Sequence, residues 1–260
     1  MVYPLIIRGK GSGFMRTVVF GDSVAKGIVT VKGKIETIKD NAVKLVSNYF
    51  GQEIDNISLY GQTLKRIYDK KIVDKYLDSM NQSEQVYAVF SLGGNDSDYD
   101  WKKVSENPYI AHDPKTPLED FERMLIEMIE KLTNRGVTVV LTTIIPLDSQ
   151  SYFDNVISKM GDPEKMMIFL ENDVENISRH QEMYSQAILR CAMKTGCTVL
   201  DIRKKMSFLE DANAYMCTDG VHPNEKGYHY LAESTIQEIN QYDLLNKWKK
   251  LPTTINTATI

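Results

Sequence analysis

Cysteine is scarce in this sequence and follows no pattern that would organise it. The 260 residues include three cysteines, Cys191, Cys197 and Cys217, and no two of them are spaced as Cys-x-x-Cys. An odd number without that spacing argues against a disulfide framework and against a metal site. Cys191 falls on an apolar helix face and Cys197 opens a predicted strand. We therefore expect buried free thiols and a reducing compartment, the cytoplasm.

Long hydrophobic runs and an excess of basic charge are also missing. Apolar runs are much shorter than the ~20 residues that cross a bilayer, and the run near the N-terminus is interrupted by Pro4. These features predict neither a membrane span nor a secretion signal. The formal net charge is -4, and the lysine and arginine clusters are short and isolated. A nucleic-acid partner is not expected, because such proteins carry a clustered basic surface.

The chain does contain an alternation of short apolar runs and amphipathic segments. Continuous apolar runs are typical of strands buried on both faces of a parallel sheet. Amphipathic segments between them predict helices. This alternation indicates an α/β protein, a three-layer α/β/α sandwich around a mainly parallel five-stranded sheet. The strands are predicted at residues 17–20, 57–60, 86–92, 137–144 and 198–202.

The helices are predicted over residues 38–49, 64–76, 121–132, 177–194 and 225–240. The third of them has the clearest start and stop signals. Thr116 is expected as its N-cap, Pro117 at its first position and Glu119 as the partner in a capping box, with Gly136 ending it. A single domain is expected over residues 16–250, between a glycine-rich lead-in (1–15) and a polar tail (251–260).

Several polar residues follow the predicted strands directly. Ser23 follows the first strand, Gly61 the second and Asn95 the third. Because sites of α/β proteins form at the carboxyl ends of the strands, these residues are expected at one edge of the sheet. Each of them alone is more typical of a turn or a helix cap than of a catalytic site.

A histidine and a carboxylate lie close together before the last predicted helix. In Asp219-Gly220-Val221-His222 the Asp219 carboxylate can orient the His222 imidazole. A lone histidine before a helix is otherwise an ordinary surface residue. Combined with a serine and with donors for an oxyanion, however, the pair supplies the groups that acyl transfer requires.

These blocks resemble those of the SGNH hydrolases, also called the GDSL esterase/lipase superfamily. The blocks stand in the family's order over about residues 16–240, as Gly21-Asp22-Ser23, Gly61, Gly93-Gly94-Asn95-Asp96 and Asp219-Gly220-Val221-His222. Val24 departs from the leucine of the family's naming motif, at a position that affects packing rather than chemistry. The serine, asparagine and histidine blocks are specific in combination, whereas the single glycine is a weak match.

The resemblance implies a flavodoxin-like sheet and a triad of Ser23, His222 and Asp219. It also implies an oxyanion hole made by the backbone amides of Ser23 and Gly61 and the side chain of Asn95. No metal or organic cofactor is implied.

The expected reaction is hydrolysis of a small-molecule carboxylic ester with a short acyl chain, such as an O-acetylated carbohydrate. Two long connections, 97–115 and 148–173, are expected to shape the pocket, with Asp98 and Trp101 as candidates for substrate contacts. Methionines around residues 160–167 would suit longer acyl chains, as in a lipase or lysophospholipase. Acyl transfer to an alcohol acceptor and a non-catalytic binding module are the remaining alternatives.

Overall fold

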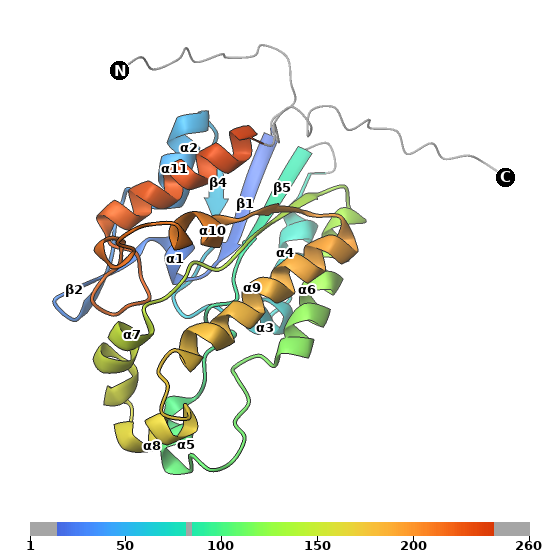
Figure 1. The fold of residues 1–260 in the computed structure, drawn as a ribbon. Helices are drawn as coiled ribbons and strands as arrows, with labels where there is room; N and C mark the ends of the chain where they lie inside the picture. Colours follow the sequence, from blue (N-terminus) through green and yellow to red (C-terminus); the bar gives the residue numbers. More distant parts are fainter. Residues whose placement is uncertain (1–14, 82–84, 242–260) are drawn as a thin grey trace.

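The computed structural model describes residues 15–81 and 85–241, which build five parallel strands between two layers of helices (Figure 1). The strand order is β4-β1-β5-β6-β7, so the chain starts inside the sheet and extends it in both directions. Numbered within this sheet the order is 2-1-3-4-5, which is the flavodoxin-like order. The predicted fold class is confirmed. The strands are β1 (Met15–Gly21), β4 (Ile54–Asn56), β5 (Gln85–Ser91), β6 (Thr138–Thr142) and β7 (Thr198–Leu200).

One face of the sheet is tightly packed with large apolar side chains. In the register between β1 and β5, Val18 faces Ala88 and Phe20 faces Phe90, with the two phenylalanine rings 5.1 Å apart. All four side chains are buried. The helices that cover this face are α3 (Leu64–Asp69), α4 (Ile72–Ser79), α6 (Leu118–Thr133) and α9 (Asn176–Thr195).

The opposite face is covered by a second layer of four helices. Its helices are α1 (Ser23–Lys26), α2 (Ala42–Phe50), α10 (Ile202–Ser207) and α11 (Glu225–Gln241). Leu200, Tyr228 and Leu231 belong to the apolar cluster on this side, together with Val140 of β6.

The two long connections fold into a helical cap beyond the carboxyl ends of the strands (Figure 1). The cap consists of α5 (Trp101–Glu106), α7 (Ser149–Asn155), the 3-10 turn η1 (Ile157–Lys159) and α8 (Pro163–Phe169). Its own apolar cluster includes Trp101, Val104, Ile157 and Met166, which are buried. Met166 therefore fills the cap interior.

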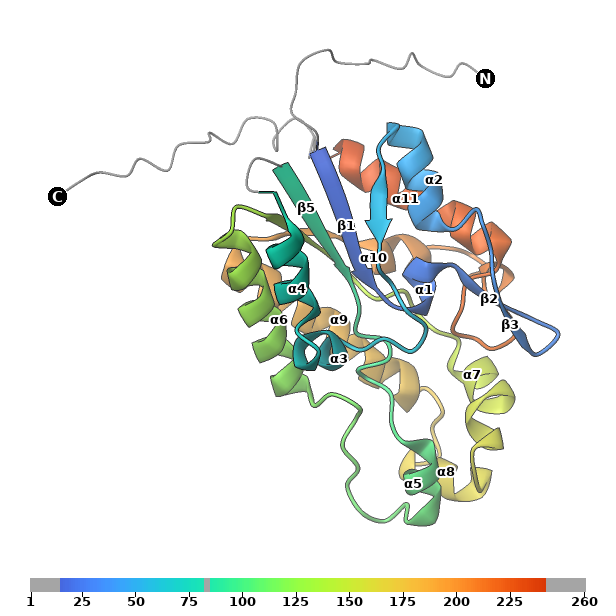
Figure 2. The same cartoon turned by 180° about the vertical axis from the view of Figure 1, so that it is seen from behind.

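A β-hairpin that the sequence reading did not predict follows α1. It pairs β2 (Ile28–Val31) with β3 (Lys34–Thr37), and it projects next to α1 in Figure 2. Its turn has φ of 50° at Lys32 and 75° at Gly33, the positive values that a two-residue hairpin turn needs. The 3-10 turn η2 (Asn213–Tyr215) precedes the loop that carries the histidine.

The predicted second strand is wrong by three residues. The strand is Ile54–Asn56, while Ile57, Leu59 and Tyr60 lie beyond it with 38%, 40% and 50% of their surface exposed. The amides of Ile57 and Leu59 still donate to Val19 and Gly21 of β1. The prediction failed because the apolar residues 57–60 follow the edge strand β4 and run along the surface, whereas an apolar run usually indicates a buried strand.

The helix predicted over residues 64–76 is two helices. Lys71 has a φ of 51°, a left-handed conformation that interrupts helical hydrogen bonding between α3 and α4.

The predicted capping box of α6 is also wrong. Helix α6 begins at Leu118 with Pro117 as its N-cap residue, and the Thr116 hydroxyl donates instead to the buried carboxylate of Asp96 at 2.6 Å. A buried carboxylate without a donor is costly, whereas water can bind the free N–H groups at the start of a helix. Thr116 therefore bonds to Asp96 and does not cap α6.

The predicted lead-in, apart from Met15, and the predicted tail lie outside the described residues. In the described ranges 15–81 and 85–241, no helix combines the length and apolar character needed to cross a membrane.

Candidate active site

Ser23 lies at the first position of α1, directly after β1, and its side chain is buried. The preceding residue, Asp22, caps this helix by accepting a hydrogen bond from the Val24 N–H at 2.9 Å. The strand therefore delivers the serine to the carboxyl edge of the sheet, and the short helix fixes its backbone.

His222 approaches Ser23 from the other end of the chain. Its Nε2 lies 2.9 Å from the Ser23 Oγ, and its Nδ1 lies 2.8 Å from Oδ2 of Asp219. The other carboxylate oxygen of Asp219 accepts hydrogen bonds from the backbone N–H groups of Val221 and His222, both at 2.9 Å. The structure thus brings the three predicted residues together as one hydrogen-bonded chain.

The environment of Asp219 determines whether its carboxyl group, at the end of this row of hydrogen bonds, is charged. Burial favours the neutral carboxyl, but the hydrogen bonds from His222 and Thr30 outweigh it and hold the pKa of Asp219 below its usual range. An ionised Asp219 is an acceptor only, so it pairs with an N–H at Nδ1 of His222. In the matching tautomer Nε2 is the acceptor of the ring, and it faces the Ser23 hydroxyl.

Thr30 is a contact of the site that the sequence reading missed. Its hydroxyl donates to Oδ2 of Asp219, and its N–H donates to Sγ of Cys217 at 3.3 Å. The hairpin β2–β3 thereby binds the same carboxylate oxygen that faces His222. The alternating residues around Lys32-Gly33 were the only sign of this hairpin in the sequence, and no spacing linked it to the histidine loop.

The histidine loop is also anchored to the helical cap. The carbonyl of Gly220 accepts a hydrogen bond from the N–H of Asp148, the residue before α7, at 2.8 Å. Gly220 has a φ of 71°, and a Cβ at this position would lie 2.5 Å from the carbonyl oxygen of Asp148. This close backbone approach requires glycine.

The predicted oxyanion residues line the same cavity as Ser23 and His222, which has a volume of about 660 Å³. Asn95 points its side-chain N–H groups at the carbonyl of Gln62 (3.2 Å) and at Oδ2 of Asp22 (3.4 Å). Gly61, in the turn between β4 and α3, is exposed, with a φ of 66°. Tyr60, another residue the sequence reading missed, stacks its ring on the His222 imidazole with 6.1 Å between centroids.

Asp98 and Trp101, the predicted substrate contacts, also line this cavity. The Trp101 Nε1–H donates to Oδ1 of Asp98 at 2.7 Å, while Oδ2 of Asp98 accepts from Lys115 (2.7 Å) and Tyr152 (3.1 Å). Trp101 is 2% exposed and belongs to the apolar cluster of the cap. The structure shows that these two residues fix the wall of the cavity, and contact with a substrate stays a prediction.

Two buried carboxyl groups support the loops around the site. Asp22 follows β1, and Asp96 accepts the N–H of Leu64 at 2.9 Å and so holds the start of α3. Burial raises the pKa of each to about 6, against the hydrogen bonds that favour the charged form. Within the described residues, no cluster of histidine, cysteine and acidic side chains is arranged to hold a metal ion.

The raised pKa of Asp22 leads to a prediction for stability. An aspartate in an unfolded chain titrates near pH 4, so the folded protein binds this proton more tightly. Its contribution favours folding at low pH and is lost as the pH rises through about 6. Lowering the pH from 7 to 5 should stabilise the wild type by about 1 kcal/mol more than Asp22→Asn.

Urea unfolding at both pH values measures this difference. Asparagine remains a good N-cap, so helix α1 is retained, and Asp40→Asn on the exposed surface is the control for the change in charge. Equal pH dependence in Asp22→Asn and the wild type would contradict the assignment.

A serine, a histidine and a carboxylate joined by hydrogen bonds at the carboxyl edge of a parallel sheet define the arrangement of an α/β serine hydrolase. The sequence model of the GDSL-like Lipase/Acylhydrolase family matches residues 19–230. The chain therefore belongs to this family of ester-bond hydrolases. No curated protein matches it significantly.

Solved structures agree on the fold. The lipase/acylhydrolase from Enterococcus faecalis is 18% identical, with a TM-score of 0.57 over 87% of this chain and 96% of its own. TesA is 16% identical, with a TM-score of 0.55 over 87% and 98% of the two chains. The esterase EstA from Pseudoalteromonas sp., solved with monoethylphosphonate as inhibitor, is 15% identical, with a TM-score of 0.51 over 89% and 98%.

Proposed function

We propose that this protein hydrolyses carboxylic esters through an acyl-enzyme on Ser23. The observation that carries the proposal is the chain of hydrogen bonds from Ser23 Oγ through His222 to Asp219. It places a nucleophile, a base and the group that orients the base within one buried unit beside a 660 Å³ cavity, a size typical of small-molecule sites.

The roles of the three residues follow from their protonation. His222 Nε2 takes the hydroxyl proton as Ser23 Oγ attacks the ester carbonyl carbon, and Asp219 stabilises the imidazolium. The tetrahedral intermediate collapses when His222 returns this proton to the departing alcohol. Water, deprotonated by His222, then attacks the acyl-enzyme, and Ser23 leaves with its proton restored.

The negative charge that develops on the carbonyl oxygen requires donors on the opposite side. We assign this role to the backbone N–H groups of Ser23 and Gly61 and to the side chain of Asn95. The Asn95 contact with Gln62 anchors the amide, whereas its contact with Asp22 is the longer of the two, at 3.4 Å. The second N–H is therefore the one that turns towards an oxyanion in the transition state.

The walls of the cavity favour a short acyl group on a polar alcohol, such as an O-acetylated carbohydrate. Lys115 and Gln181 lie beside the aromatic rings of Tyr99 and Tyr152 around the cavity. His180 also lines it, and its Nε2 is buried without a hydrogen-bond partner among the described residues. A buried nitrogen of this kind gains a partner when a hydroxyl group of the substrate binds.

The direct test is covalent labelling of Ser23. Incubation with a fluorophosphonate should add the mass of one phosphonyl group to the peptide that contains Ser23, because the activated oxygen attacks phosphorus as it attacks a carbonyl carbon. Denatured protein is the control, since labelling requires the folded triad. An intact, folded protein that stays unlabelled would favour a non-catalytic binding module on the same fold.

A further inference from the structure

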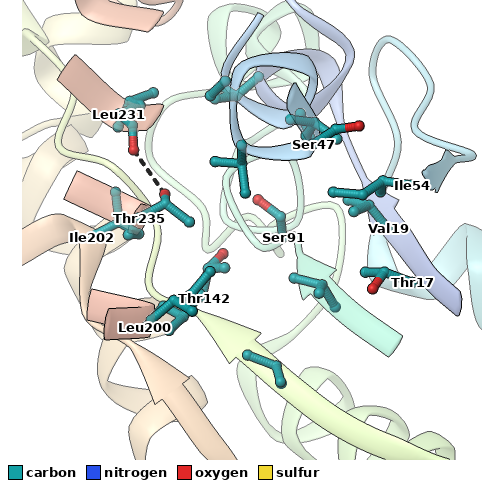
Figure 3. Close-up of a pocket in the computed structure, with 18 of the residues that line it drawn as sticks. Thr17, Val19, Ser47, Ile54, Ser91, Thr142, Leu200, Ile202, Leu231 and Thr235 are labelled. Atoms are coloured by element: carbon teal, nitrogen blue, oxygen red, sulfur yellow. Dashed lines mark hydrogen bonds between the residues drawn. The ribbon is translucent and has the colours of Figure 1, made fainter. Parts of the chain in front are cut away.

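A second cavity lies between the sheet and the helices α2 and α11 (Figure 3). Its volume is about 180 Å³. Side chains from all five strands of the sheet form its floor, and side chains of α2 and α11 line it from the other side. Figure 3 shows Thr17, Ser91 and Thr142 on the strands, with Ser47 and Thr235 on the helices.

The cavity arises from the different composition of the two faces of the sheet. On the tightly packed face, the central strand β5 carries Phe90, which is 3% exposed. On the other face, the same strand carries the buried Tyr87, followed by Val89 and Ser91, which are only partly buried although β5 has a neighbouring strand on each side. The small side chains of Val89 and Ser91 leave a void larger than those that close-packed interiors contain.

The lining of this cavity selects an uncharged, apolar occupant. No lysine, arginine or histidine is among the described residues that line it, and its one charged residue is Asp22 at the border. The hydroxyls of Ser47 and Thr235 already donate to the backbone carbonyls of Gln52 and Leu231. A carboxylate or phosphate would therefore be buried without a counter-charge.

The volume sets the size of the occupant. An engineered apolar cavity of about 150 Å³ binds benzene, so 180 Å³ accommodates roughly six carbon atoms. The position indicates where such a chain comes from. Asp22, Val24, Ile144 and Ile145 line both this cavity and the one that contains Ser23, so the two spaces are neighbours.

We propose that the cavity between the sheet and α2/α11 is a binding site for an uncharged aliphatic chain of about six carbons. Such a chain has two sources, which the experiment separates. It is either the acyl tail of an ester longer than the acetyl esters proposed above, with its carbonyl at Ser23, in which case the proposal rests on the esterase function, or a separately bound alkyl molecule.

The experiment blocks the cavity and measures two probes. Thr142→Phe fills the void from β6, and Thr138→Phe is the matched control because it lies on the same face of the same strand outside the lining. The probes are p-nitrophenyl acetate and hexanoate for kcat/KM, and 1-hexanol for the shift in melting temperature. Thr235→Phe fills the same void from α11 and replaces Thr142→Phe if that variant fails to fold.

If the acyl tail occupies the cavity, Thr142→Phe should lower kcat/KM for the hexanoate about tenfold or more while leaving the acetate unchanged. Thr138→Phe should behave like the wild type. If a separate alkyl molecule occupies it, both esters should react normally in all variants, and 1-hexanol should raise the melting temperature of the wild type but not of Thr142→Phe.

The proposal is overturned if the hexanoate-to-acetate ratio is the same in all variants and 1-hexanol either stabilises none of them or stabilises Thr142→Phe as well. The 1-hexanol measurement requires no hydrolysis, so it also applies to a Ser23→Ala variant. If the wild type hydrolysed neither ester, the esterase function would be contradicted, but the 1-hexanol measurement would still test the cavity.

Discussion

Replacing Ser23 with alanine should lower kcat for p-nitrophenyl acetate by roughly 10⁶-fold, towards the rate set by binding and the oxyanion donors alone. In the proposed mechanism the Ser23 oxygen forms the acyl-enzyme, and without it the proposed base His222, 2.9 Å away, loses the hydroxyl group that it activates for attack. Initial rates at saturating substrate measure the effect, and the fluorophosphonate label should disappear together with the activity.

The control for this variant is a measurement of its folding. Alanine keeps the first position of α1, and the Asp22 cap on the Val24 N–H does not involve the serine side chain. The melting temperature should therefore stay close to that of the wild type. Activity within tenfold of the wild type, in a variant that is folded, would exclude Ser23 as the nucleophile.

Replacing Asp219 with asparagine should lower kcat by roughly 10⁴-fold, the size of effect found when a triad acid loses its charge but keeps its shape. Asp219 accepts hydrogen bonds from His222, Thr30 and two backbone N–H groups. An asparagine oxygen satisfies only part of this set, and its NH₂ group cannot accept the proton on Nδ1. His222 then adopts the tautomer in which Nε2 carries the proton.

Asp201→Asn is the control for the loss of one carboxylate. Asp201 caps α10 and accepts the Thr143 hydroxyl at 3.0 Å, outside the site, so its variant should keep wild-type kcat. If Asp219→Asn and Asp201→Asn retained the same activity, another group would have to orient His222.

The sequence predicted the ends of the strands better than the segments between them. Ser23 and Asn95 follow strands whose continuous apolar runs identify them without ambiguity, so their meeting at one edge of the sheet follows from the parallel order alone. The run 57–60 has the same composition, yet it lies at the surface beside the site, where Tyr60 stacks on His222. Apolar composition does not distinguish a buried strand from an exposed segment that lines a pocket.

Contacts that depend on tertiary structure were beyond the reach of local patterns. Thr30 reaches Asp219 across 189 positions of the chain, and Thr116 gives up a local cap in order to bind Asp96. In both cases a buried carboxylate determines which partner the threonine takes. The break at Lys71 could not be predicted either. The helical spacing of apolar residues continues across it, although the helical backbone is interrupted there.

The distance in sequence between Ser23 and His222 has a consequence for the moment at which the protein becomes active. The two side chains that we propose share the catalytic proton are separated by 199 positions, and a chain leaves the ribosome from its N-terminus. Ser23 is therefore synthesised early, whereas its proposed base follows only after all five strands of the sheet, the last of which ends at Leu200. A truncated product that ends before Asp219 lacks two of the three residues of the proposed triad, so we expect hydrolysis only from chains that are synthesised beyond His222.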